Sequence, residues 1–156
     1  MRISMTEGAK LQIVRCFAAR PERVWQACTR PELLQLWFSP KPFHDCVVEA
    51  DVRVGGRFFF RMTGEPGTFA AEGVYREVDE PRRLVLSWTW VEGPPDQPPD
   101  GATSLVTFEL EADGEGTRLT LTHEGLADQE QAESHEEGWT EVLEKLAKLI
   151  GEGAQG

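Results

Sequence analysis

The sequence predicts an α+β fold in which a curved, seven-stranded antiparallel sheet wraps around one long C-terminal helix, with two short helices after the first strand. Runs of alternating apolar residues follow one another through residues 44–123, and Gly, Pro and Asp residues typical of turns separate them. Consecutive strands with short connections favour antiparallel pairing. The C-terminal segment has instead the period of an amphipathic helix.

The N-terminal elements come first. A strand is expected at Lys10–Phe17, where both faces carry apolar groups. Pro21 suits the first turn of a helix that continues to about Thr29. A second short helix is expected to begin near Pro31 and to be stopped by Pro40. Both helices are too short to be stable alone, so they must pack on the rest of the molecule.

Six further strands follow. They are expected at His44–Asp51, Arg57–Thr63, Phe69–Val78, Leu84–Val91, Ser104–Glu111 and Thr117–His123. The segment Glu92–Gly101 holds four prolines, which cannot join a sheet interior, so it is expected to be an extended loop. Asp51, Arg53, Gly55 and Gly56 predict a tight turn or bulge, with the charged pair bridging adjacent strands.

The long helix is expected to start after the capping residue Asp128 and to end at Gly151. Its acidic stretch, Glu130–Glu144, predicts a solvated face, or alternatively a docking patch for a basic partner. Gly138 lies inside the helix, where glycine costs about 1 kcal/mol relative to alanine. We therefore expect a closely packed neighbour at this position.

Length and charge bound the function. The 156 residues predict a single domain over 1–156, with an ordered core of about 10–150. The formal net charge of −11 argues against nucleic acid and against anionic membranes as partners. No apolar run has the length of a membrane span and no leader peptide is visible, so we expect no membrane insertion and a cytoplasmic location.

Motifs for cofactor or metal chemistry are lacking. Cys16, Cys28 and Cys46 have no C-x-x-C spacing and predict reduced thiols, and Cys46 lies near His44 without enough further ligands for a metal. No Ser-His-Asp, H-E-x-x-H, Rossmann or Walker pattern is visible. We therefore expect no cofactor and no metal.

Large apolar side chains predict a ligand cavity. Alternation through the strand 84–91 places leucines and tryptophans on one face, and a second wall comes from the strand 57–63. The competing interpretation is an ordinary packed core, and for Trp37 an anchor between helices instead of an entrance residue. The candidate ligand-binding residues are Trp37, Phe58, Phe60, Met62, Leu86, Trp88, Trp90, Leu121, His123, Trp139 and Leu143.

Two histidines raise a catalytic alternative. His123 shares the strand face of Leu119 and Leu121, and His135 lies on the inner side of the long helix. With an interior acid such as Glu72 they would form an acid–base site. The simpler interpretation is that both histidines are hydrogen-bonded or exposed.

The sequence resembles the family of activators of heat-shock-chaperone ATPase, within the START/birch-pollen-allergen-like (SRPBCC) superfamily. The segment Asp51–Phe58 is similar to the family signature D-x-R-x-G-G-x-[FW]. The other matching segments are Arg15–Phe17, Ala19–Ala27, Thr29–Glu32, Trp37, Gly73–Val78, Pro81–Val85, Gly116–His123 and Gly138–Trp139.

The resemblance implies a helix-grip fold and a deep apolar cavity between the sheet and the C-terminal helix. The family's chaperone activator has a separate N-terminal chaperone-binding domain that this sequence lacks, which argues against direct activation of a chaperone ATPase.

Three functions are weighed. The first is a carrier or sensor of a small hydrophobic or amphipathic molecule, with Glu92–Gly101 and Gly64–Gly67 as gates. The second is a cyclase, dehydratase or hydrolase that uses the same cavity. The third is a module that interacts with a chaperone. The sequence leaves open whether the protein forms a homodimer.

Overall fold

The computed structural model describes residues 9–40 and 43–151. The order of elements is the predicted one: β1 (Ala9–Phe17), α1 (Pro21–Thr29), α2 (Pro31–Trp37), β2 (Phe43–Ala50), β3 (Arg57–Gly64), β4 (Gly67–Asp79), β5 (Arg83–Glu92), β6 (Thr103–Asp113), β7 (Gly116–Leu126) and α3 (Gln129–Ile150). The α+β prediction is confirmed. Several strands are longer than expected, and β7 continues past His123 to Leu126.

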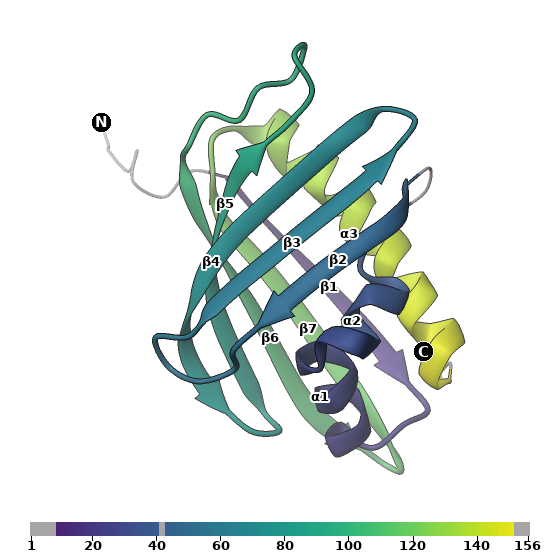
Figure 1. Ribbon diagram of the computed structural model, residues 1–156. Coiled ribbons are helices and arrows are strands. Elements are labelled where there is room, and N and C mark those ends of the chain that lie inside the picture. Colours follow the sequence, from purple (N-terminus) through teal and green to yellow (C-terminus); the bar gives the residue numbers. More distant parts are fainter. Residues whose placement is uncertain (1–8, 41–42, 152–156) are drawn as a thin grey trace.

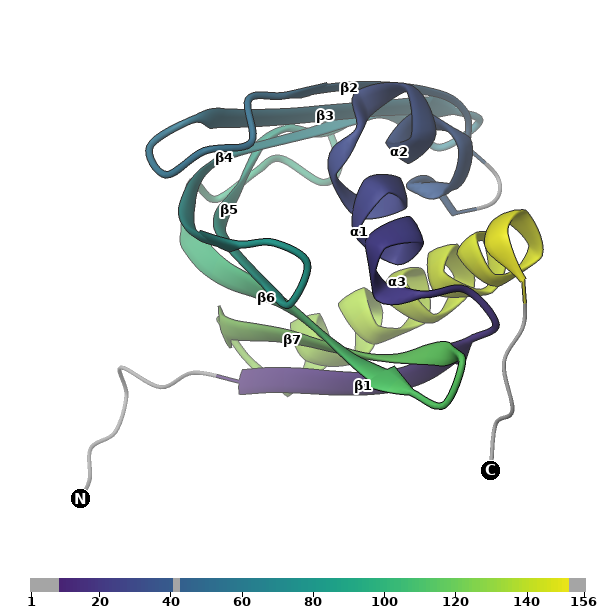
Figure 2. The same ribbon diagram turned by 90° about the horizontal axis from the view of Figure 1, so that it is seen from below.

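One antiparallel sheet contains all seven strands, in the order β1-β7-β6-β5-β4-β3-β2. The chain crosses from the β1 edge to the β2 edge through α1 and α2. Figures 1 and 2 show the sheet curled around α3, with α1 and α2 closing one side. This is the helix-grip arrangement, and it leaves one end of the grip to be closed by loops.

A buried indole completes the helix pair. Pro31 has no N–H, so the carbonyl of Ala27 lacks its donor four residues on. The indole N–H of Trp37 donates to that carbonyl at 2.9 Å, and the Trp37 side chain is fully buried. Trp37 is therefore the anchor between the helices, and its role as an entrance residue is not what the structure shows.

The glycine motif between β2 and β3 forms a tight turn. Gly55 has φ of +88° and donates its N–H to the carbonyl of Tyr75 at 2.8 Å. A Cβ at Gly56 would lie 1.9 Å from the carbonyl oxygen of Asp51, so only glycine fits. Arg53 pairs with Asp51 at 2.9 Å within this turn. The expected bridge between adjacent strands is thus replaced by a bridge within the loop.

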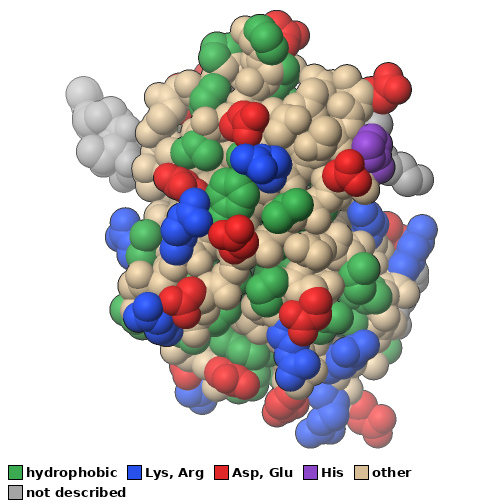
Figure 3. Space-filling view, viewed as in Figure 1, with side chains coloured by type: hydrophobic (Ala, Val, Ile, Leu, Met, Phe, Trp, Pro, Cys, Tyr) green, Lys and Arg blue, Asp and Glu red, His purple; other side chains and the backbone are tan. Residues whose placement is uncertain are grey.

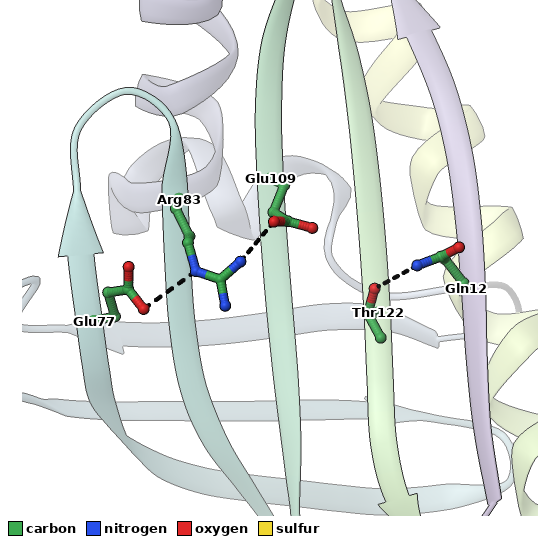
Figure 4. Close-up of polar contacts among 5 residues, drawn as sticks. All are labelled: Gln12, Glu77, Arg83, Glu109 and Thr122. Carbon is green, nitrogen blue, oxygen red and sulfur yellow. Dashed lines mark hydrogen bonds and ion pairs between the residues drawn. The ribbon is translucent and has the colours of Figure 1, made fainter.

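The outer face of the sheet is a mixed ionic surface. Figure 3 shows acidic and basic side chains alternating with hydrophobic ones over β2, β3 and β4. Figure 4 shows Arg83 between Glu77 and Glu109, and Gln12 against Thr122.

Glu72, a candidate interior acid, lies on this outer face. It pairs with Arg57 at 3.1 Å and is about half exposed. Its strand position puts it opposite Phe59 and not opposite the inward Phe58 or Phe60. The prediction that Glu72 faces the interior was wrong.

Helix α3 begins and ends as expected. Asp128 accepts the backbone N–H of Gln131 at 2.9 Å, and Gly151 follows the last turn with φ of +115°. Gly138 differs, because a Cβ built there meets no atom within 4 Å. The prediction of a closely packed neighbour was wrong, and open space lies beside this turn of the helix.

None of the described helices has the length and apolar content needed to cross a membrane. Within residues 9–40 and 43–151, the three cysteines form no disulfide. In the same residues no group of three or more His, Cys, Asp or Glu side chains is arranged to hold a metal ion.

Candidate ligand pocket at the open end of the grip

Aromatic rings fill the space between the middle of the sheet and α3. Trp88 of β5 and Trp139 of α3 lie with ring centroids 5.7 Å apart. Phe38, directly after α2, lies between them and β3, at 5.0 Å from Phe60 and 5.5 Å from Trp139. The deep cavity expected from the resemblance is therefore occupied by side chains at this level.

A pocket of about 680 Å³ opens beyond this aromatic layer, at the open end of the grip. We call it the mouth pocket. Figure 1 shows the loop between β5 and β6 at the same end of the molecule as the start of α3. The lining residues are Phe38, Pro40, Phe43, Phe60, Met62, Phe69, Trp88, Trp90, Glu92, Gln97, Pro98, Pro99, Asp100, Asp128, Glu130, Gln131, Ser134, His135, Gly138, Trp139 and Val142.

The structure divides the predicted site residues into two groups. Those that line the mouth pocket are Phe60, Met62, Trp88, Trp90 and Trp139. Those that lie in the packed core, each at most 3% exposed and outside the lining, are Trp37, Phe58, Leu86, Leu121, His123 and Leu143. Strand alternation identified the inward face correctly. It carries no information on depth, and these six residues lie in the packed core, with Trp37 between the two short helices.

Other lining residues were not predicted. Phe43 and Phe69 form one wall, with ring centroids 5.5 Å apart, and Phe69 also contacts Trp90. Phe69 lies two and six positions before the buried residues Ala71 and Tyr75, so strand alternation alone predicts that it faces inward. Phe38 lies at the end of a short helix, where no periodic pattern points to its role.

The loop after β5 forms the rim. Four residues of this loop line the pocket, as expected for an extended loop over its opening: Gln97, Pro98, Pro99 and Asp100. The turn between β3 and β4 supports this loop, because a Cβ at Gly67 would lie 3.1 Å from the Pro94 ring. The gating role of both segments stays a prediction, but only the longer loop lines the pocket.

His123 is buried beneath the pocket and fully hydrogen-bonded. The indole N–H of Trp139 donates to its Nδ1 at 3.1 Å, which leaves the proton on Nε2. That Nε2–H donates to the hydroxyl of Ser104 at 2.7 Å, and the hydroxyl donates on to the carbonyl of Trp88 at 3.2 Å. Burial, which is the larger cause, and the neighbouring His135 together lower the pKa of His123 to about 3.

His135 repeats this arrangement on the pocket wall. The indole N–H of Trp90 donates to its Nε2 at 3.0 Å, and its Nδ1 lies 2.8 Å from the carbonyl of Gln131, to which it donates. The rings of His135 and His123 are 4.9 Å apart. Burial lowers the pKa of His135 as well, so both imidazoles are neutral at neutral pH.

These bonds decide what the histidines can do. A general base needs a free lone pair, and in both rings an indole N–H occupies it. Burial raises the pKa of the Cys46 thiol to about 11 and that of the Cys28 thiol to about 12, so both stay protonated at neutral pH. Neither histidine and neither of these two thiols is therefore poised for acid–base or nucleophilic chemistry.

One polar atom of the pocket wall lacks a hydrogen bond. The indole N–H of Trp88 is buried and has no partner among the described residues. Leaving a buried donor unsatisfied costs about 1–3 kcal/mol. The atom marks a place where an acceptor, if one could reach it, would be stabilising.

Comparison with known proteins identifies the family of this chain. Residues 18–151 match the model of the family described as Activator of Hsp90 ATPase homolog 1-like protein. A protein of Chromobacterium violaceum superposes with a TM-score of 0.81 at 27% identity, over 92% of this chain and 98% of that one. The AHSA1 protein of Silicibacter pomeroyi does so with a TM-score of 0.75 at 32% identity, over 91% and 97%.

A protein of Nitrosomonas europaea is also 32% identical, with a TM-score of 0.70 over 90% of this chain and 93% of that one. The search of curated proteins found no match. The family match covers most of the chain and agrees with the helix-grip topology described above. The chain belongs to the Activator of Hsp90 ATPase homolog 1-like family, part of the SRPBCC superfamily.

Proposed function

We propose that the protein binds a small hydrophobic or amphipathic molecule in the mouth pocket, as a carrier or a sensor. The observation that carries this proposal is the pocket itself: about 680 Å³, walled by aromatic rings and open to solvent at one end. Pockets of a few hundred to about 1,000 Å³ with mainly apolar walls are typical of small-molecule sites.

The walls supply affinity without a covalent or metal bond. A guest that buries about 250 Å² of apolar surface gains roughly 6 kcal/mol from the hydrophobic effect. A free energy of about 6 kcal/mol corresponds to a dissociation constant of about 40 micromolar. Loss of translational and rotational freedom consumes part of this gain, so we expect dissociation constants of about 40 micromolar or weaker. Aromatic walls add edge and face contacts, and Met62 adapts to guests of different shape.

The same geometry favours binding over catalysis. The two histidines near the pocket donate and accept hydrogen bonds within the protein, and they do not direct a free nitrogen at a guest. The carboxylates that face the pocket lie on its rim, as does the loop of residues 97–100. Binding needs only the shape and the apolar walls that are present.

Gly138 allows binding to be tested without damage to the fold. It lines the pocket, and its missing side chain leaves open space. Gly138→Leu puts four carbon atoms beside the pocket and also replaces a poor helix former by a good one. Gly138→Ala is the matched control, because it gives a similar gain in helix propensity with a single carbon.

The probe is 1-pyrenemethanol, a neutral aromatic alcohol whose absorption overlaps tryptophan emission, so binding appears as energy transfer from the pocket tryptophans. We expect saturable binding to the wild type, nearly unchanged binding to Gly138→Ala, and at least about tenfold weaker binding to Gly138→Leu. Native mass spectrometry of unstripped protein is the second measurement, and a retained small molecule absent from Gly138→Leu supports the proposal. Equal affinity of all three proteins would place the binding elsewhere and refute it.

A further inference from the structure

We propose that the mouth pocket selects organic cations, that is, amphipathic molecules that carry an amine or a quaternary ammonium group on an apolar body. This inference rests on the proposed function and names the chemical class of its ligand. It is argued from the charges on the rim, the neutral state of the one titratable base on the wall, and the π surfaces behind them.

The rim is acidic. Four carboxylates face the pocket, from Glu92, Asp100, Asp128 and Glu130, and none of its described lining residues is Lys or Arg. Arg61 lies 3.4 Å from Glu92 and offsets that charge. The other three form no ion pair with the described part of the chain, so their charges act on whatever enters.

His135 and the N-terminal end of the α3 dipole are two further possible sources of positive charge near the rim. Neither cancels the charges of the carboxylates. His135 is neutral at pH 7, because burial lowers its pKa and an indole N–H occupies its Nε2. The start of α3 carries about half a positive charge from the helix dipole. The carboxylate of Asp128, which accepts the N–H of Gln131, meets that partial charge directly. A net negative potential at the rim remains from Asp100 and Glu130.

The walls behind the rim present π electrons. Trp90 lines the pocket and is half-buried, so part of its π surface is open to a guest, while its N–H is bonded to His135. Phe69 lies 6.1 Å from Trp90, and Phe43 continues the same wall. An ammonium group within about 6 Å of such ring faces is attracted by their quadrupoles. Aromatic faces below a carboxylate rim are the environment that stabilises an organic cation.

The same arrangement disfavours an anionic guest. A fatty acid or other carboxylate would place its charge among the rim carboxylates, and no described lining residue offers a guanidinium or ammonium partner. The chain as a whole carries a net charge of −11, which adds to the repulsion. Charge therefore sets the choice among guests of similar shape.

The test compares three pyrene probes that differ in charge: 1-pyrenemethylamine, 1-pyrenemethanol and 1-pyrenecarboxylate. Dissociation constants are measured by energy transfer from tryptophan at pH 7 and about 0.1 M salt, where the contribution of distant charges is largely screened. We expect the amine to bind at least about tenfold more tightly than the carboxylate, with the alcohol between them.

Matched variants separate the rim from the overall charge. Asp100→Asn with Glu130→Gln removes two rim charges, and Glu133→Gln with Glu137→Gln removes two charges from an exposed face of α3 outside the pocket. Asp128 is left intact because it caps the helix. The rim variant should bind the amine roughly three- to tenfold more weakly and the alcohol as before, whereas the face variant should match the wild type.

The outcomes distinguish this inference from the function on which it rests. Binding of the alcohol together with equal or tighter binding of the carboxylate overturns the cation preference and leaves the pocket as a site. An equal loss of amine affinity in the rim and face variants also overturns it, because overall charge then explains the effect. Failure of all three probes to bind refutes both the inference and the proposed function.

Discussion

The buried histidine pair predicts that the protein loses stability as the pH falls below neutral. Burial holds the pKa of His123 at about 3, against an ordinary value of 6.5 in the unfolded chain. A histidine with a lowered folded pKa takes up its proton more readily when unfolded. Its contribution to stability is therefore complete above pH 6.5 and is lost as the pH falls from 6.5 toward 3.

The size of the loss follows from the two pKa values. At pH 7 about a quarter of unfolded molecules carry the proton, and at pH 5 nearly all do, while the folded state stays neutral at both. With pKa values of 6.5 and about 3, His123 alone lowers the free energy of unfolding by about 2 kcal/mol between pH 7 and pH 5. The pKa of His135 is also lowered, so it adds to the loss in the same direction.

The assay is urea unfolding followed by tryptophan fluorescence at pH 5, 6 and 7. His123→Gln keeps an acceptor for Trp139 and a donor for Ser104 but cannot take up a proton. It should lose about 2 kcal/mol less than the wild type across the window. His44→Gln, at a side chain that is 67% exposed, is the control. Identical pH slopes for the wild type and His123→Gln would show that burial of a neutral His123 does not act as described.

Three further substitutions test local geometry by thermal and urea unfolding. Gly138→Ala should raise the free energy of unfolding by about 0.5–1 kcal/mol, because its Cβ meets open space, and a loss of stability would contradict the open turn. Gly73→Ala should cost at least about 3 kcal/mol, because its Cβ would lie 1.8 Å from the carbonyl oxygen of Ser87, and a stable variant would contradict that approach. Trp37→Phe should cost about 2–3 kcal/mol by orphaning the Ala27 carbonyl, and a neutral result would mean that another donor replaces the indole.

The order of elements was predictable because each has a local cause. Alternation identified the strands, prolines marked the starts of α1 and α2, and Asp128 marked the start of α3. The inward face of β5 followed from the spacing of Leu84 to Trp90 in the same way. These signals depend on residues that are neighbours in sequence, so the sequence alone contains them.

The site was only partly predictable, because its depth depends on how the sheet curls. Phe58 and Phe60 lie two residues apart on the same face of β3, yet Phe60 lines the mouth pocket and Phe58 lies beneath it. Phe38 fills the interior from the end of a short helix, where no pattern marks it. Gly138 shows the limit most clearly, since a helix glycine indicates either close packing or open space, and only the tertiary structure distinguishes them.

The base of the pocket is held by hydrogen bonds within the protein, whereas the rim carboxylates Asp100 and Glu130 are exposed. At the base, Trp139 and Trp90 are each held by an imidazole, and His123 passes its bond on to Ser104. Removing any of these groups leaves a buried donor or acceptor unsatisfied, so changes at the base should act mainly on stability. At the rim, Asp100 and Glu130 face solvent, so changes there should act mainly on which guest binds. If the protein binds ligands as proposed, affinity and selectivity come from different layers of one pocket, and we expect the rim to tolerate substitution without loss of the fold.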